Sequence, residues 1–140
     1  MNWLLDTCVL SEYVSRSPAP GVIGWLDSQD ESRLFVSVIS LGEIEKGIIK
    51  LRAADARRAQ KLATWFGHLQ HRFADRTLVI DGPAMRAWAA LSAGAEMVGR
   101  KLPLMDGLLM GTAQCHGLTV VTRNVRDFAR YPDVFDPWTL

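Results

Sequence analysis

The sequence predicts an α/β fold in which a central, mainly parallel sheet of four to five strands is covered by helices on both faces. Two observations lead to this prediction. Short apolar runs of strand length alternate with longer segments of helical composition, and strands separated by helices pair in parallel. Apolar residues make up 49% of the 140 residues, enough for a core without disulfides. Because no repeat or linker interrupts the chain, residues 1–140 are expected to form one domain.

The first half of the chain predicts two buried strands, each followed by helical structure. Residues 3–5 are apolar, and the polar residues directly after them can cap the start of a helix. After two prolines, residues 21–29 have the spacing of a short amphipathic helix. Residues 34–36 form the second apolar run, and a serine-capped helix is expected to follow it to about residue 52.

The second half begins with residues 53–76, which are rich in Ala, Arg, Lys, Leu and Gln and lack proline. This composition predicts one long exposed helix. The remaining strands are expected at residues 77–80, 119–122 and, as a short final strand, near 134–135. Two further helices are expected at residues 84–98 and 103–115. In such sheets ligands bind beyond the carboxyl ends of the strands, so polar residues there are the first candidates for function.

Composition argues against several classes of protein. The net charge of +1 does not by itself indicate nucleic-acid binding, and no apolar run approaches the roughly 20 residues needed to cross a bilayer. The N-terminus has no basic segment before its short apolar run, so no signal peptide is expected and the protein is expected to be cytoplasmic. Cys8 and Cys115, the only cysteines, are interpreted as small buried residues, and no zinc-ligand spacing is present.

The clearest chemical signal is Asp106, the only charged residue between Leu102 and Cys115. A helix that is apolar nearly all round is a buried helix, so a lone carboxylate in it needs a partner. The structural alternative is an acid in the first helical turn, where the helix dipole stabilises it by about 0.3–1 kcal/mol. Gly107 and Gly111 favour a functional role, because glycine costs about 1 kcal/mol relative to alanine in a helix and suggests a close approach.

Two further acids occupy comparable positions. Asp6 ends the first apolar run, where it either caps the next helix or serves a functional site. After the second strand, Ser40, Glu43 and Gly47 form a narrow line of small or polar residues beside the apolar stripe of the helix. This line predicts a helix face that opens onto a cleft. In the alternative interpretation, Glu43 is an ordinary charge at the edge of an amphipathic helix.

A fourth candidate region follows the strand near the end of the chain. This strand delivers Thr122 and Asn124 to the edge of the sheet at which Asp6 should lie, and Asp127 comes one turn later. The same loop is basic, and basic side chains beside carboxylates can hold phosphates. The candidates for such contacts are Arg123 and Arg126.

Carboxylates that converge without a lysine or arginine repel one another. The usual remedy is a hard divalent cation, and Mg²⁺ or Mn²⁺ prefers oxygen ligands of this kind. Such a cation can lower the pKa of a bound water and stabilise charge that develops on a phosphodiester. The acids together therefore predict a divalent-metal site, and nucleases commonly use this chemistry.

Five segments carry a family resemblance over almost the whole chain. They are Leu-Leu-Asp6-Thr-Cys-Val-Leu-Ser-Glu, Val-Ser-Val-Ile-Ser-Leu-Gly-Glu43, Leu-Pro-Leu-Met-Asp106-Gly-Leu-Leu-Met-Gly-Thr-Ala, Val-Thr-Arg-Asn124-Val-Arg-Asp127-Phe and Phe135-Asp-Pro-Trp138. Each segment alone is weak, but their order and spacing are specific. Together they resemble the PIN-domain ribonucleases of the VapC toxin family, and especially the FitB-like subgroup of type II toxin–antitoxin systems.

The resemblance implies a PIN-like three-layer α/β/α sandwich and a hydrolase of RNA phosphodiester bonds. The implied enzyme is a Mg²⁺-dependent endoribonuclease, with Mn²⁺ as a substitute ion, that cleaves structured RNA such as tRNA or rRNA. Asp6, Glu43 and Asp106 match the metal-binding acids of the family.

One family position departs from the pattern. Asn124 stands where the family commonly has a fourth acid, which leaves open whether one or two metal ions bind. Asn124 can ligate through its carbonyl or orient a water, and Asp127 can substitute by reaching back from the following turn. Thr7 and Thr122 are implied as hydroxyls that orient the metal ligands.

The resemblance also implies partners. A small antitoxin similar to VapB or FitA is expected to hold the protein inactive by laying its tail across the active-site groove. A homodimer or a toxin–antitoxin hetero-oligomer is expected. DNA is expected to be bound only through the antitoxin, and no membrane is involved.

Two other interpretations fit part of the pattern. A receiver or haloacid-dehalogenase-like phosphatase also uses aspartates at strand ends. The phosphatase needs a second acid where Cys8 stands, and both classes need a late lysine where Arg123 stands. A catalytically inactive PIN-like module that binds protein or RNA is the second alternative, and Asn124 is the argument for it. An active site predicts the three carboxylates within a few ångströms of one shared point.

Overall fold

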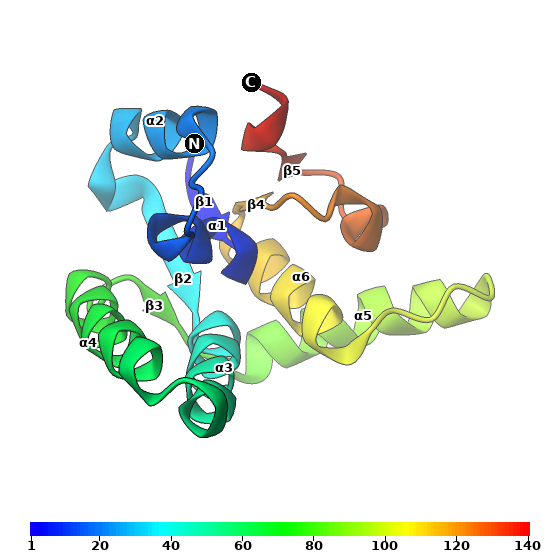
Figure 1. Ribbon diagram of the computed structural model, residues 1–140. Helices are drawn as coiled ribbons and strands as arrows, with labels where there is room; N and C mark the ends of the chain where they lie inside the picture. Colours follow the sequence, from blue (N-terminus) through cyan, green and yellow to red (C-terminus); the bar gives the residue numbers. More distant parts are fainter.

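Five parallel strands form the central sheet of the computed structural model, which describes residues 1–140 (Figure 1). The strands are β1 (Trp3–Leu5), β2 (Leu34–Ser37), β3 (Thr77–Leu78), β4 (Thr119–Val121) and β5 (Val134–Phe135). Their order across the sheet is β3-β2-β1-β4-β5, and every neighbouring pair is parallel. The prediction of an α/β fold with four to five strands is therefore confirmed.

Six α-helices and four 3₁₀ turns connect the strands. The α-helices are α1 (Thr7–Ser11), α2 (Pro20–Ser28), α3 (Val38–Ala54), α4 (Ala56–Arg72), α5 (Gly82–Met97) and α6 (Leu104–His116). The 3₁₀ turns are η1 (Glu12–Val14), η2 (Glu31–Arg33), η3 (Val125–Phe128) and η4 (Pro137–Thr139). None of the helices has the length and apolar character of a membrane span.

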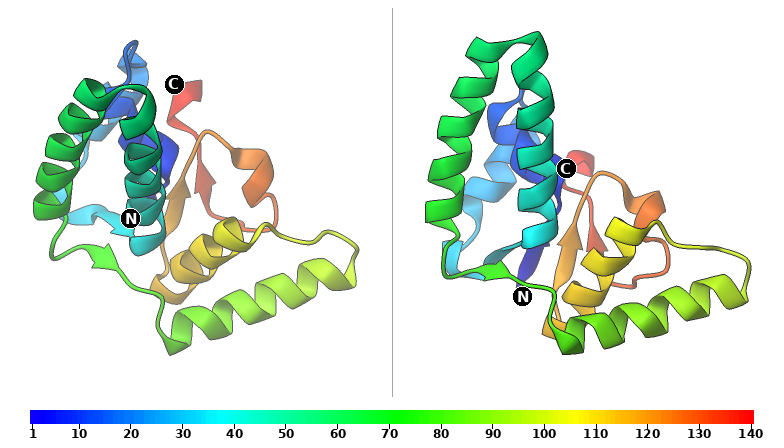
Figure 2. Two further views of the ribbon diagram at one scale, coloured as in Figure 1. Left: turned by 60° about the horizontal axis from the view of Figure 1, so that its bottom comes forward. Right: turned by 90° about the horizontal axis from the view of Figure 1, so that it is seen from below.

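Helices cover both faces of the sheet, because successive strand residues point to opposite sides. Leu5 and Val121 belong to a core that α1, α2, α3 and α4 complete, whereas Leu4 and Val120 belong to a second core with α6 and η3. Figure 2 shows the α3–α4 pair and the α5–α6 pair on either side of the strands. The result is the predicted three-layer α/β/α arrangement.

The strand order changes direction at β1, which positions the candidate site. The chain builds β2 and β3 on one side of β1, then returns to place β4 and β5 on the other side. Leu5, the last residue of β1, pairs with Val121, the last residue of β4. Residues that follow these two strands therefore emerge side by side, at the switch point where parallel sheets bind ligands.

The prediction of one long exposed helix over residues 53–76 is wrong. Asp55 leaves the helical conformation (φ −153°, ψ 85°), and its side chain accepts a hydrogen bond from the Arg58 N–H, so α3 ends before it and α4 begins after it. Helix α4 also buries a sparse apolar stripe, formed by Ala59, Phe66 and Leu69. The many charged residues between these three made the whole segment look exposed. The third strand also ends at Leu78 rather than at residue 80.

Neither cysteine is a core residue, which corrects the interpretation from sequence. Cys8 is half-buried, and Cys115 is exposed. Cys115 belongs to the last turn of α6, where Gln114 and His116 are exposed as well. Helix α6 is therefore buried along its middle but not at its C-terminal end.

Gly107 and Gly111 allow helix α5 to pack closely against α6. A Cβ atom built on Gly111 would lie 2.8 Å from the Trp88 backbone nitrogen and 2.9 Å from the Ala84 carbonyl oxygen. A Cβ atom on Gly107 would lie 3.1 Å from the Trp88 indole ring. The sequence correctly indicated a close approach to this helix, but the neighbour is another helix of the same chain. The two glycines therefore do not support a functional role for Asp106.

Gly111→Ala is expected to destabilise the fold by about 1–3 kcal/mol. The added methyl group would overlap the backbone of α5, which cannot move away as a flexible side chain can. Gly67, in the middle of α4, is the matched control, since a Cβ atom there meets nothing within 4 Å. Gly67→Ala is expected to stabilise the fold by up to about 1 kcal/mol. Urea unfolding measures both changes, and a Gly111→Ala variant as stable as the parent would contradict this packing.

Candidate active site

Asp6 lies at the switch point of the sheet, directly after β1. Its backbone N–H donates to the Val121 carbonyl of β4 at 3.0 Å. The residue is only 8% exposed, and its carboxylate accepts two hydrogen bonds of 2.8 Å, from the Thr7 N–H to Oδ1 and from the Thr122 hydroxyl to Oδ2. Because a buried carboxylate is costly unless its oxygens have partners, these donors hold the side chain in one orientation.

The Thr122 hydroxyl is itself oriented by a backbone group. Thr122 is fully buried, and its Oγ1 accepts a hydrogen bond of 3.0 Å from the Asn124 N–H. A hydroxyl has one proton to donate, so this contact leaves that proton for Asp6. The loop after β4 thus sets the direction of a carboxylate that follows β1.

Cys8 is a neighbour of the acid that the sequence analysis missed. Its sulfur lies 3.8 Å from Asp6 Oδ2 and 3.7 Å from Thr122 Oγ1. Burial raises the pKa of the Cys8 thiol, and the Asp6 charge adds to this effect, so the group stays neutral beside the carboxylate. Its position two residues after Asp6, in the first turn of α1, is the signal that could have located it here.

Glu43 reaches the same place from helix α3. The side chain is exposed, and its Oε1 accepts a hydrogen bond of 3.1 Å from the hydroxyl of Thr7, whose N–H binds Asp6. The predicted polar line on this helix opens onto grooves at Glu43 and Gly47 but not at Ser40. Ser40 is fully buried, and its hydroxyl has no hydrogen-bond partner, so its side chain faces the protein interior rather than a groove.

Two grooves meet at Glu43 and Gly47, one on each side of α3. The larger groove has a volume of about 690 Å³ and is bounded by α3 and the start of α6. The smaller groove has a volume of about 380 Å³ and lies between α3, α4 and the α1–η1 segment. Both volumes fall in the range of ligand-binding clefts. A chain-like ligand bound at the acids can leave the site along either groove.

Asp106 lies half-buried in the first turn of α6. Burial, followed by the negative charges of Asp127, Asp6 and Glu43, raises the pKa of Asp106 to about 6. None of the four acids Asp6, Glu43, Asp106 and Asp127 has a lysine or arginine within 4 Å. The salt bridges of the protein all involve other carboxylates. Four acids in one electrostatic field without a basic partner are the arrangement that a divalent cation neutralises.

The donor set fits a hard cation in kind, since carboxylate oxygens are the ligands that Mg²⁺ prefers. The ligands are not closed around one point, however. No three acidic, histidine or cysteine side chains are grouped closely enough to hold an ion, so the predicted convergence of Asp6, Glu43 and Asp106 is not observed. In this arrangement, oxygens of Asp6 and Glu43 accept hydrogen bonds from Thr7 and Thr122.

Asn124 and Asp127 lie near Asp6, Glu43 and Asp106, but neither side chain forms a hydrogen bond with these acids. Asn124 is exposed and contributes its backbone N–H, through the contact with Thr122, rather than its side chain. Asp127 is exposed in η3 and acts on Asp106 through its charge. Asn124 therefore acts on the site through its backbone, and Asp127 acts on it through its charge.

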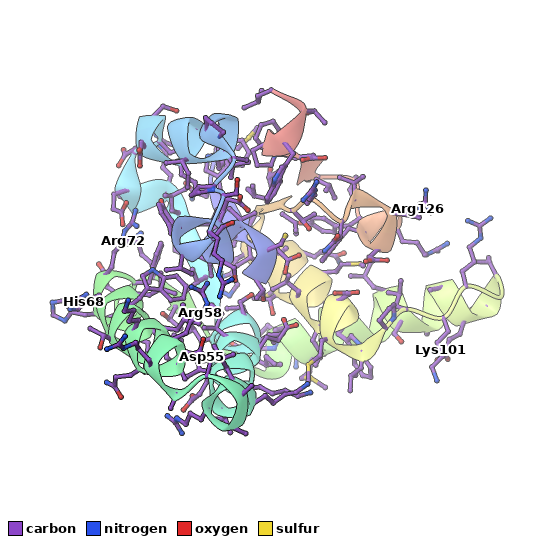
Figure 3. The ribbon with its side chains drawn as sticks, in the orientation of Figure 1. Asp55, Arg58, His68, Arg72, Lys101 and Arg126 are labelled. Carbon is purple, nitrogen blue, oxygen red and sulfur yellow. The ribbon has the colours of Figure 1, made fainter.

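Arg123 and Arg126, the candidate phosphate contacts, point in different directions. The Arg123 guanidinium stacks on Trp138, with 5.5 Å between Cζ and the ring centroid. Arg126 projects outward from η3 (Figure 3). Both side chains are exposed and neither forms a salt bridge.

Removing the Asp106 charge is expected to stabilise the protein in EDTA at neutral pH. The folded state raises its pKa from the ordinary 3.8 to about 6, so the ionised form is disfavoured by folding. This cost is fully present above about pH 6 and disappears as the pH falls toward about 4. Solvent screening of the half-exposed side chain keeps the effect on the order of 1 kcal/mol.

Urea unfolding of Asp106→Asn measures this effect. The variant should exceed the parent in stability near pH 8 and match it near pH 4, whereas Asp27→Asn, a control on the exposed face of α2, should change little at either pH. An Asp106→Asn variant less stable than the parent near pH 8 would show that the helix dipole outweighs the repulsion.

Comparison with known proteins gives the family. A family model described as PIN domain matches residues 3–134. A VapC ribonuclease of Sinorhizobium fredii is 33% identical over 136 residues, covering 96% of each chain, and the toxin FitB of Neisseria gonorrhoeae is 33% identical over 138 residues, covering 96% of this chain and 97% of FitB. The crystal structure of FitAcB from Neisseria gonorrhoeae matches with a TM-score of 0.92 and 31% identity over 99% of both chains. The chain therefore belongs to the PIN-domain family, in the branch that contains the VapC ribonucleases and the toxin FitB.

Proposed function

We propose that this protein is a divalent-metal-dependent endoribonuclease and the toxin of a toxin–antitoxin pair. The observation that carries the proposal is that Asp106 lies within the electrostatic influence of Asp6, Glu43 and Asp127, with no basic partner for any of them, at the carboxyl edge of the sheet and next to the two grooves that Glu43 lines. Relatives that match over nearly the whole chain and are named as a VapC ribonuclease and as toxin FitB support it.

In this proposal Asp6, Glu43 and Asp106 hold Mg²⁺, with Mn²⁺ as a substitute, and Asn124 or Asp127 supplies a further oxygen. When bound, such an ion lowers the pKa of a water and stabilises charge that develops on a phosphodiester. Burial and the repulsion by neighbouring acids together raise the pKa of Asp106, and this repulsion is the feature of the chain that favours the uptake of a cation.

The acids differ in how firmly the protein holds them. Asp6 is nearly buried and fixed by two donors, so it serves as the reference point of the site. Glu43 has a single hydrogen bond and an exposed side chain, and Asp106 is half-exposed. Completing the site therefore requires the two less constrained acids to turn toward Asp6, while Thr7 and Thr122 keep Asp6 in place.

We further propose that the substrate is structured RNA, such as tRNA or rRNA in the cytoplasm, and that an antitoxin similar to VapB or FitA blocks the site. A similar solved structure, with a TM-score of 0.91 and 31% identity over 99% of this chain, is described as FitAB bound to a DNA fragment. By analogy, DNA is bound through the antitoxin, and the protein forms a homodimer or a toxin–antitoxin hetero-oligomer.

The test is RNA cleavage by the purified protein without antitoxin. Total tRNA and rRNA should be cut in Mg²⁺ or Mn²⁺ and left intact in EDTA, and calorimetry should detect binding of the ion alone. Absence of both cleavage and ion binding would contradict the proposal. That outcome would favour an inactive PIN-like module that binds protein or RNA, for which the uncharged Asn124 is the argument.

A further inference from the structure

Arg58 connects the smaller groove to a second concave surface. The wall of the smaller groove includes Thr7 and Glu43, which belong to the candidate active site around Asp6, Glu43 and Asp106, here called the acid site. The same wall also includes Arg58. Arg58 lines, in addition, a neighbouring depression of about 210 Å³ at the start of α4. Its Nη2 donates to the Val14 carbonyl at 3.4 Å, which holds the guanidinium between α4 and η1, close to Asp55 at the turn (Figure 3).

This second surface, here called the basic depression, has no apolar residue. It is lined by Arg16, Asp55, Arg57, Arg58 and Lys61. The carboxylate of Asp55 caps α4 through the Arg58 N–H, and none of the four cations forms a salt bridge. Four unpaired cations beside one acid create a local positive potential in a protein whose net charge is only +1.

The path along the smaller groove is more basic than the path along the larger one. The larger groove is lined by Lys46, Lys50 and Glu43, and a neighbouring depression that shares both lysines adds Glu45, so the charges along this path balance. The smaller groove and the basic depression together set four cations against Glu43 and Asp55. A polyanion that extends from the acid site is therefore favoured along the smaller groove.

The walls of the smaller groove suit nucleotides rather than an acidic peptide. Leu62 and Trp65 of α4 line it opposite Ile44 and Ile48 of α3. Single-stranded nucleic acids bind where cations hold the phosphates and apolar or aromatic side chains contact the bases. An acidic polypeptide would use the cations but carries no base at each unit to place against Trp65.

We propose that the RNA strand leaves the acid site along the smaller groove, with its backbone phosphates held by the basic depression. The inference rests on the proposed ribonuclease function and adds a substrate-binding surface to it. Arg57 and Lys61 are the direct phosphate contacts, since both are exposed and lie one helical turn apart on α4. Arg58, held by the Val14 carbonyl, forms the link between the groove and the depression.

Two double variants with the same charge change and the same helical spacing test this proposal. Arg57→Gln/Lys61→Gln alters the basic depression, and Lys46→Gln/Lys50→Gln is the matched control in the larger groove. Binding of a fluorescein-labelled oligouridylate is measured by anisotropy in EDTA over a series of salt concentrations, and circular dichroism checks the fold. The first variant should bind roughly tenfold more weakly, with a logarithmic salt slope shallower by about 1.4, and the control should bind like the parent.

The outcomes separate this proposal from the proposed function. If the parent cleaves RNA in Mg²⁺ but both double variants bind equally well or equally weakly, the assignment of the groove is wrong and the nuclease function stands. If the parent neither cleaves nor binds RNA, both fail together. If poly-glutamate binds as tightly as the oligouridylate and depends equally on Arg57 and Lys61, the surface takes acidic polypeptides and the RNA assignment is overturned.

Discussion

Asp6→Asn is expected to lower the rate of RNA cleavage by about 100- to 1000-fold while leaving the fold intact. The variant keeps the shape of the side chain, so the Thr7 N–H retains an oxygen acceptor. It removes the charge of the one acid that is nearly buried and held by two donors. The loss of several kcal/mol of metal-dependent transition-state stabilisation corresponds to this range, since about 1.36 kcal/mol is a factor of ten.

A matched pair on helix α3 separates this role from a general effect of charge. Glu43 and Glu45 are both exposed acids of α3, but only Glu43 contacts Thr7 and lies where the grooves meet. Glu43→Gln is expected to lower cleavage by about tenfold or more, and Glu45→Gln to leave it unchanged. Initial rates at saturating and limiting Mg²⁺ measure both. Equal losses from the two variants, or an Asp6→Asn enzyme as active as the parent, would overturn the assignment.

Thr122→Val is expected to weaken divalent-ion affinity by about 10- to 100-fold, with a matching loss of cleavage at limiting Mg²⁺. Valine keeps the volume of this fully buried side chain but removes the hydroxyl. Asp6 Oδ2 then loses its hydroxyl donor and keeps only the weaker Cys8 thiol, and the Asn124 N–H loses its acceptor. The carboxylate is then held firmly only at Oδ1, by the Thr7 N–H, and about 1–3 kcal/mol of folding stability is lost with the unpaired groups.

Thr122→Ser is the conservative variant that distinguishes orientation from packing. Serine restores the hydroxyl between the Asn124 N–H and Asp6 but not the methyl group, so ion affinity should return while part of the stability loss remains. Calorimetric titration with Mn²⁺ and urea unfolding give the two readouts. If Thr122→Val binds the ion like the parent and is only less stable, the hydroxyl serves the fold alone.

Much of the fold follows from local pattern. The apolar runs that became β1, β2 and β4 are short and bounded by polar residues, and those features are visible without knowing any neighbour. The start of α3 was also marked locally, by the serine cap that the structure places at Ser37. The sparse stripe of α4 shows where this reasoning stops, because a few buried residues among many charges do not stand out in composition.

For the candidate site, the sequence by itself determined which residues were chemically unusual: a lone acid in α6, an acid after β1 and a polar line on α3. Only the tertiary structure decided what these residues contact. Thr7 meets Glu43 across 36 positions, Thr122 meets Asp6 across 116, and Trp88 rather than a ligand lies against the glycines of α6. Such contacts depend on the order of the strands and on how helices pack over them. Periodicity reports only which face of an element is apolar, and so cannot specify its partner.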